Sequence, residues 1–324
     1  MDFTLPDTAQ ELQHALARWS TDGRRVHYPR TAYSRESWTD FLRWELLSPD
    51  FGDTLHRCVG FMEVSRRGLP GPVLEAYLAV SADSSGQCSA ALRAGSVVTS
   101  VGPAERANSL VGWGAVADLV VDQVSGAVLA TAALPAAQFA YALPHGWIVR
   151  DSAPGGDPLQ AERWLFGAAL LAGLAAGALE LTVEHTSVRH QFGKPLAAAQ
   201  AVQFPLAELK MWCEGLRLSV LDAALRRDLG HELWPVSSAL AWLNGAQAAR
   251  LVTSVCHQSF GALGFCTEAG LVNLTWAMSW LRLSVGVDSA RGYVVANTEP
   301  RLDSDGRPDP GCLVLDGFRS KARP

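Results

Sequence analysis

Two short segments of the sequence carry side chains that could hold a charged ligand. The first, SVRHQFGKPLAAAQ from Ser187 to Gln200, places Arg189 directly after a long apolar stretch and shortly before Gly193 and Pro195. An arginine guanidinium makes charge-assisted hydrogen bonds to a carboxylate or a phosphate. The same arginine at a helix C-terminus would offset the helix dipole with no ligand present. Both interpretations stay open at this point.

The second segment, HQSFGALGF from His257 to Phe265, interrupts an apolar helical pattern. Gly261 and Gly264 allow another group to approach the backbone closely, and Gln258 offers both hydrogen-bond donors and an acceptor. A glycine-containing turn between two helices would have the same composition. The usual dinucleotide, P-loop, metalloprotease and serine-hydrolase motifs are absent, and the histidines are too dispersed to predict a metal site.

The composition favours a globular protein that binds no nucleic acid. The chain of 324 residues has 48% apolar residues, which is enough for a large core in about two domains. Its net charge is −5, and its basic residues are scattered without a run that could follow a phosphate backbone. Six widely spaced cysteines predict neither a zinc site nor disulfides. With no signal-like segment at the N-terminus, we expect a cytoplasmic protein.

One uncharged, strongly apolar stretch predicts a buried helix and no membrane contact. It runs for sixteen residues, from Trp164 to Leu179, whereas a membrane span requires roughly 20. Gly173 and Gly177 lie within it as a pair of small residues four positions apart, a spacing that lets another helix approach closely.

Changes in periodicity divide the chain into four parts. Helical patterning extends over residues 1–92, and short β-branched runs between turn formers predict a small β domain over 93–150. Turn formers at 151–158 predict a linker. Helical patterning over 158–298 predicts a four-helix bundle, with helices that include 163–188, 235–260 and 271–295. One seam of the bundle is predicted from the repeat of Leu206, Leu209, Cys213, Leu216 and Val220. The remainder, 299–324, has the composition of a loosely attached or disordered tail.

Together, and in this order, the segments resemble the acyl-CoA dehydrogenase family. RHQFGKP followed by Gln200 matches the family pattern R-x-x-F-G-x-P with a glutamine eleven residues after the arginine. QSFGALGF is similar to Q-x-x-G-G-x-G-aromatic, with Ala262 in place of the second glycine. MDFTLPDTAQELQ and MEVSRRGLPGPVL resemble the N-terminal domain of the family, and LVGWGAVADLVV resembles a strand pair of its middle domain.

This resemblance implies a fold, a cofactor and a reaction. The fold is mainly α with a small middle β domain between an N-terminal α domain and a C-terminal four-helix bundle. The implied reaction is FAD-dependent oxidation of an acyl thioester to a trans-2-enoyl thioester, with electron-transfer flavoprotein as acceptor. In the family, FAD crosses a subunit interface. The cofactor-binding residues implied here are Arg189 at the pyrophosphate, Gln191, Phe192, Gln200, Gln258, Gly261, Ala262 and Gly264.

The sequence departs from the family where a catalytic base is expected. The usual base is a glutamate directly before a glycine in the last helix, and at the best match, Gly286, the preceding residue is Val285. The alternative position, at the start of the first bundle helix, is occupied by Arg163. Two neighbouring carboxylates, Glu162 and Asp288, are the only weak candidates. The middle domain is also shortened: VVTSVGPAERANSLVGWGA replaces the loop that touches the flavin and the thioester in the family.

These departures resemble the short subunit of heteromeric, α2β2-type acyl-CoA dehydrogenases. We therefore expect a longer homologous partner that supplies the glutamate and the flavin-ring pocket. Three alternatives remain: a self-sufficient homo-oligomeric dehydrogenase that uses Glu162 or Asp288, a non-catalytic structural subunit without flavin, and a flavin-dependent oxygenase. The sequence identifies neither the acyl group nor its carrier, coenzyme A or acyl carrier protein.

Overall fold

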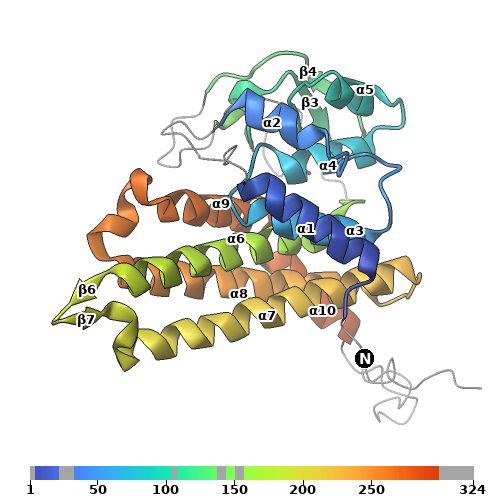
Figure 1. Cartoon of the computed structure of the whole chain (residues 1–324). Helices are drawn as coiled ribbons and strands as arrows, with labels where there is room; N and C mark the ends of the chain where they lie inside the picture. The colour runs from blue at the N-terminus through green and yellow to red at the C-terminus, as the bar shows by residue number, and fades with distance from the viewer. Residues whose placement is uncertain (1–3, 22–32, 104–107, 137–143, 150–156, 299–324) are drawn as a thin grey trace, which may run out of the picture.

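The computed structural model describes residues 4–21, 33–103, 108–136, 144–149 and 157–298 (Figure 1). The predicted tail at 299–324, most of the linker at 151–158 and Cys312 lie outside the described residues. Elements follow one another in the expected order, with helices first, short strands in the middle and long helices last. The fold class, mainly α with a small β part, is confirmed. The domain boundaries at 92, 150 and 158 stay a prediction.

Four long helices form the C-terminal bundle: α6 (Gln160–Val188), α7 (Gln200–Asp228), α8 (Trp234–Phe260) and α9 (Leu271–Val285). The predicted seam of α7 is confirmed, since its five members are all buried. Successive contacts show that α6 and α8 run parallel: Gly167 lies beside Trp242, the Cys256 thiol is 3.7 Å from the carbonyl oxygen of Ala178, and the His185 and Phe260 rings stack. Both helices therefore end at the same end of the bundle.

The prediction of one continuous last helix over 271–295 is wrong. Helix α9 ends at Val285, and a separate helix, α10 (Asp288–Thr298), follows. Gly286 between them has φ 76° and ψ 157°, which glycine adopts without strain and which no helix allows. Its carbonyl oxygen accepts a hydrogen bond from the indole of Trp242. The chain therefore changes direction at Gly286, the glycine that the resemblance matches to the one after the usual catalytic glutamate.

The N-terminal part consists of α1 (Asp7–Thr21), α2 (Arg35–Leu42), α3 (Thr54–Ser65), α4 (Val73–Ala82) and α5 (Gln87–Arg93). The bundle holds the start of α3, because both carboxylate oxygens of Asp228, at the end of α7, accept backbone N–H groups of Thr54 and Leu55 at 2.9 Å. Asp53 accepts the N–H of His56 at 2.8 Å. The first three N–H groups of α3 are thus all paired, as the start of a helix requires.

The other end of α3 packs directly on the two small residues of α6. A Cβ atom added at Gly173 would lie 2.0 Å from the carbonyl oxygen of Met62, and one at Gly177 would lie 1.8 Å from that of Arg66. The prediction of close helix packing at these glycines is confirmed. By length and composition α6 could cross a membrane, but 78% of its most apolar window is buried inside the structure. It is packed here as a core helix.

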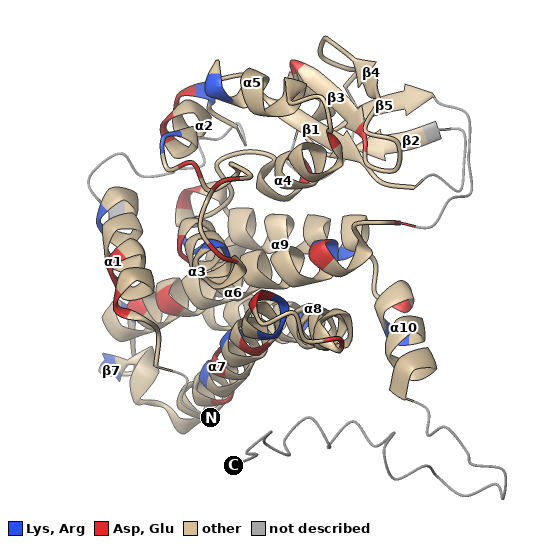
Figure 2. Ribbon diagram, turned by 90° about the vertical axis from the view of Figure 1, so that its right-hand side faces the viewer, with Lys and Arg blue, Asp and Glu red and all other residues tan. Residues whose placement is uncertain are grey.

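The β part comprises β1 (Val98–Val101), β2 (Asn108–Val111), β3 (Leu119–Asp122), β4 (Val128–Ala130) and β5 (Gly146–Val149). Strand β3 pairs in parallel with β1 and antiparallel with β4, while β2 pairs antiparallel with β5. Figure 2 shows these strands and α4 on one side of α6 and α9, with α7 and α8 on the other. A small core of Val101, Val111, Ala117 and Val120 holds the strands together.

We expect Gly177→Ala to destabilise the protein by about 1–3 kcal/mol, because its new methyl group would overlap a backbone oxygen that cannot move alone. The matched control is Gly215→Ala in α7, where an added Cβ meets no atom within 4 Å. This change should be neutral or stabilise by up to about 1 kcal/mol, since alanine favours the helix. Urea unfolding measures both effects. Equal stabilities of the two variants would contradict the close packing of α3 on α6.

Candidate functional site

The first candidate segment forms a hairpin at the end of α6. Arg189 is the first residue beyond α6 and has extended geometry, and β6 (His190–Gln191) then pairs with β7 (Lys194–Pro195). The turn residues Phe192 and Gly193 have φ values of 53° and 79°. A positive φ is unfavourable for a bulky side chain, yet Phe192 is 98% exposed and gains no packing within this chain in return. The hairpin projects from the bundle end (Figure 1).

The second candidate segment ends α8. Gly261 follows Phe260 with φ 63° and ψ −145°, a conformation that is accessible almost only to glycine, and no atom lies within 4 Å of where its Cβ would be. The chain continues as a 3₁₀ helix, η3 (Gly261–Phe265). Gly264 differs from Gly261, because its added Cβ would lie 2.9 Å from Phe260 Cβ and 3.1 Å from His257 Nδ1. Packing alone therefore requires a glycine at position 264.

The parallel packing of α6 and α8 brings the two segments together. The ring of His185 stacks on that of Phe260 at a centroid distance of 4.1 Å and an interplanar angle of 11°. Both segments therefore leave their helices at one end of the bundle. Most of the predicted cofactor-binding residues are exposed there: Arg189, Gln191, Phe192, Gln200, Gln258, Gly261 and Ala262. Gly264 is buried.

The bundle end carries an available positive charge. Within the described part of the chain, no carboxylate lies within ion-pair distance of Arg189. Burial, followed by the charge of Arg189, lowers the pKa of His185 and so favours the neutral imidazole. His257, which sequence reasoning did not select, packs against Phe265 and shares a hydrogen bond of 3.0 Å with Thr275. An exposed guanidinium beside open backbone and exposed amides suits an anionic ligand.

The two candidate bases have different surroundings, and neither is a buried, available carboxylate. Glu162 forms an ion pair with Arg227 of α7 and accepts a hydrogen bond from the Tyr77 hydroxyl at 3.0 Å. Those contacts link α4, α6 and α7. Asp288 is 99% exposed at the start of α10 and lies 3.6 Å from Arg291. A general base must reach the substrate proton inside a shielded site. The surroundings of both residues therefore weigh against that role.

Arg163, at the alternative base position, is a buried structural residue. Its guanidinium pairs with Asp157 at 2.7 Å and donates a hydrogen bond to Gln123 at the end of β3. A Cβ added at Gly102 would lie 3.0 Å from the same guanidinium. This arginine therefore ties the start of α6 to the β part.

Sequence reasoning missed a buried carboxyl group where the N-terminal helices, the β part and the bundle meet. Glu75 of α4 is buried, and its Oε1 accepts a hydrogen bond of 2.9 Å from the indole of Trp280 in α9. The ring of His145 packs on Trp280 at 3.9 Å. A signal was present, because Glu75 is the one charged residue of the apolar helix 73–82. Burial raises the pKa of Glu75 and lowers that of His145 to about 4, so both neutral forms are favoured.

Trp280 and Glu75 pack closely against the backbone at Gly112. A Cβ added at Gly112 would lie 2.6 Å from the Trp280 ring and 2.8 Å from Glu75 Oε1. Trp113, the next residue, is fully buried. The described side chains beside Gly112 therefore pack closely. Across the described residues, no group of three His, Cys, Asp or Glu side chains is placed to hold a metal ion.

Comparisons with known proteins identify relatives of the C-terminal part of the chain. A family model described as acyl-CoA dehydrogenase, C-terminal domain, matches residues 156–290. The short-chain specific acyl-CoA dehydrogenase of Megasphaera elsdenii is 38% identical over 101 residues, which cover 31% of this chain and 26% of that protein. The chain thus aligns with about a quarter of the length of the curated relatives that it matches.

Solved structures extend the similarity to nearly the whole chain. A chain of the ChsE4-ChsE5 complex from Mycobacterium tuberculosis has a TM-score of 0.71 at 19% identity, covering 92% of this chain and 98% of that chain. Butyryl-CoA dehydrogenase from Megasphaera elsdenii has a TM-score of 0.67 at 18% identity, covering 91% and 99%. At such identities the similarity shows the fold, which is the fold that the sequence resemblance predicted.

We expect Glu75→Gln to change the pH dependence of stability. Because the folded state raises the pKa of Glu75, its ionisation makes the protein less stable as the pH rises above the ordinary glutamate value. Glutamine can still accept the Trp280 hydrogen bond and does not ionise. The melting temperature of the variant relative to the parent should therefore increase between about pH 4 and pH 8. Exposed Glu208→Gln is the control, and a constant difference across this range would refute the buried carboxyl group.

Proposed function

We propose that this protein, whose residues 156–290 match the family model for the acyl-CoA dehydrogenase C-terminal domain, is one subunit of an FAD-dependent acyl-thioester dehydrogenase. In this proposal a longer homologous partner supplies the catalytic glutamate and the flavin-ring pocket. The observation that carries the proposal is a contrast between two places. Arg189 is exposed at the bundle end, whereas Glu75 and Trp280 are buried and pack closely beside Gly112.

The bundle end has the donor set that a dinucleotide needs. Arg189 has no carboxylate partner among the described residues, so its guanidinium can pair with a pyrophosphate oxygen. Gln200 and Gln258 are exposed and can orient the ribose and adenine through their amides. Gly261 keeps the backbone open at the turn. Bound FAD would supply the hydride acceptor for the oxidation. Phe192, exposed on its strained turn, would pack near the adenine.

Among the described residues, neither candidate base of this chain is well placed to remove the substrate proton. Val285 occupies the position of the usual glutamate, and a valine side chain cannot accept a proton. Glu162 is held by Arg227 and Tyr77, and Asp288 is in open solvent. We therefore assign the base to the partner subunit. The close packing beside Gly112 supports the same division, because the resemblance implies that the flavin ring and the thioester lie against the middle β domain.

The remaining parts of the proposal concern the setting of the enzyme. We propose a heterotetramer of two short and two long chains in the cytoplasm, with FAD shared across each unlike interface. The similarity to a chain of the ChsE4-ChsE5 complex supports a fold that can assemble with an unlike chain. Electrons would leave to an electron-transfer flavoprotein.

In the complex with the long partner, Arg189→Ala should remove most of the bound flavin, because the cofactor pyrophosphate loses its charged partner. Arg189→Lys should retain part of it. Flavin absorbance per protein after gel filtration measures the loss. Arg250→Ala, an exposed change on α8, is the control. Undiminished flavin in Arg189→Ala would contradict the role of this arginine.

Within the same complex, Glu162→Gln and Asp288→Asn should leave substrate-dependent flavin reduction within about threefold of the parent rate. Loss of a true general base costs on the order of 10²–10⁴-fold. Anaerobic stopped-flow bleaching of the flavin measures this rate. Glu162→Gln should lower the melting temperature, because it breaks the ion pair with Arg227. A loss of a hundredfold in a variant with the parent's circular dichroism would instead make this chain the source of the base.

A further inference from the structure

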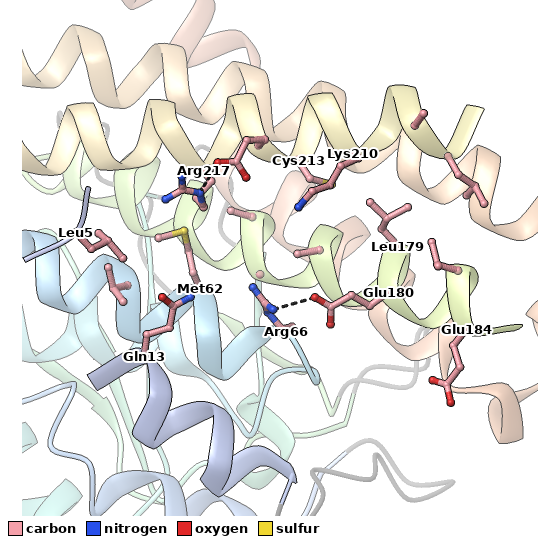
Figure 3. Close-up of a pocket in the computed structure, with 18 residues that line it drawn as sticks. Leu5, Gln13, Met62, Arg66, Leu179, Glu180, Glu184, Lys210, Cys213 and Arg217 are labelled. Atoms are coloured by element: carbon pink, nitrogen blue, oxygen red, sulfur yellow. Dashed lines mark hydrogen bonds and ion pairs between the residues drawn. The ribbon is translucent and has the colours of Figure 1, made fainter. Parts of the chain in front are cut away.

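A cavity of about 650 Å³ lies between α1, α3, α6 and α7 (Figure 3). Its volume is within the range of about 300–1,000 Å³ that small-molecule sites occupy. None of its lining residues belongs to the bundle-end site or to the junction around Glu75. The cavity is therefore a separate feature, and the proposed dehydrogenase reaction does not use it.

Small residues of α6 form the floor of the cavity. Ala172, Gly173 and Ala176 leave part of the helix surface flat, and longer apolar side chains of α6 and of neighbouring elements form the walls. These walls comprise Leu5, Val59, Met62, Leu179, Val183 and Leu206. The position of α3 is fixed, because its end packs on Gly173 and Gly177. The result is a preformed apolar trough, which suits a hydrocarbon chain.

Two of the three cations at the cavity are already neutralised. Arg66 pairs with Glu180 at 2.8 Å, and Arg217 pairs with Glu214 at 2.5 Å. Each pair joins two residues that line the cavity. Because each guanidinium is paired with a carboxylate, these two arginines add little net charge for a ligand.

The third cation, Lys210, is available. Among the described residues no carboxylate lies within ion-pair distance of its ammonium group. Arg217 and, to a smaller extent, the charge of Lys210 lower the pKa of Glu214. Figure 3 shows the Lys210 ammonium directed into the cavity, whereas the Glu184 carboxylate extends away from it. The neighbouring Cys213 is buried, and burial raises its pKa to about 12, so it adds no charge.

We propose that this cavity binds a single-chain amphiphile with an anionic head, such as a long-chain acyl carboxylate. The apolar chain lies on the flat face of α6, and the head pairs with Lys210. A polar metabolite would place its polar groups against the apolar walls, which offer them no hydrogen bonds. A cationic head would be repelled by the positive charge of Lys210. The inference stands independently of the proposed function, because it needs neither FAD nor a partner chain.

The test is displacement of a fluorescent acyl carboxylate, cis-parinaric acid, from the purified full chain. Dodecanoate, below its micelle concentration, should displace the probe saturably with one site per chain. Dodecanol, which has the same chain length but no charge, should bind more weakly. Lys210→Met should weaken dodecanoate binding about three- to tenfold, as for one partly exposed ion pair, and leave dodecanol binding unchanged. Lys210→Arg should restore dodecanoate binding.

Two further variants close the cavity without touching its charges. Ala176→Leu raises the floor, and Ala207→Trp, from an exposed position of α7, blocks the rim. Each should abolish saturable displacement while the melting temperature shows that the chain is folded. Arg250→Met, outside the cavity, is the charge control and should bind as the parent does. Non-saturable displacement, unchanged binding in both blocking variants, or equal losses for dodecanoate and dodecanol in Lys210→Met would overturn the proposal.

Discussion

The structure depends on the burial of α6, which runs parallel to α8 through the centre of the molecule. One part of α6 has only small side chains facing α3, so that backbone oxygens of α3 pack directly on Gly173 and Gly177. At its start, Arg163 ties it to Asp157 and Gln123. At its end, His185 stacks on Phe260 of α8. The N-terminal helices, the β part and the two candidate segments all take their positions from this one helix.

The two ends of α6 have opposite characters. At the C-terminal end the chain turns away in a short hairpin, and the surface carries an exposed arginine, exposed amides and a glycine turn without packing neighbours. The N-terminal part leads to a junction where the Trp280 indole bonds to buried Glu75 and the ring of His145 packs on Trp280. In the proposed function, the exposed end contributes cofactor-binding residues and the partner supplies the flavin-ring pocket. This asymmetry supports a shared active site.

Local sequence patterns predicted most of the fold, because burial repeats with helical spacing. The seam at Leu206 to Val220 and the close packing at Gly173 could be read from neighbouring residues alone. The hairpin at Phe192 could not, since a phenylalanine at positive φ goes against its own preference. The break at Gly286 was missed because apolar spacing continues across it.

Contacts between residues far apart in the sequence could not be predicted. The partner of Glu75 lies 205 positions along the chain, and no local pattern reveals such a contact. The cavity above α6 likewise exists only once α1 and α3 have docked.

We propose that this chain contributes one half of a cofactor site and relies on its partner for the other half. The most direct measurement is the flavin content of the purified complex with its long homologue, compared with the content of this chain alone. We predict one FAD for each pair of unlike chains and no stoichiometric FAD in the isolated chain. Two FAD per pair, or a stoichiometric FAD in the isolated chain that an acyl thioester reduces, would contradict the account.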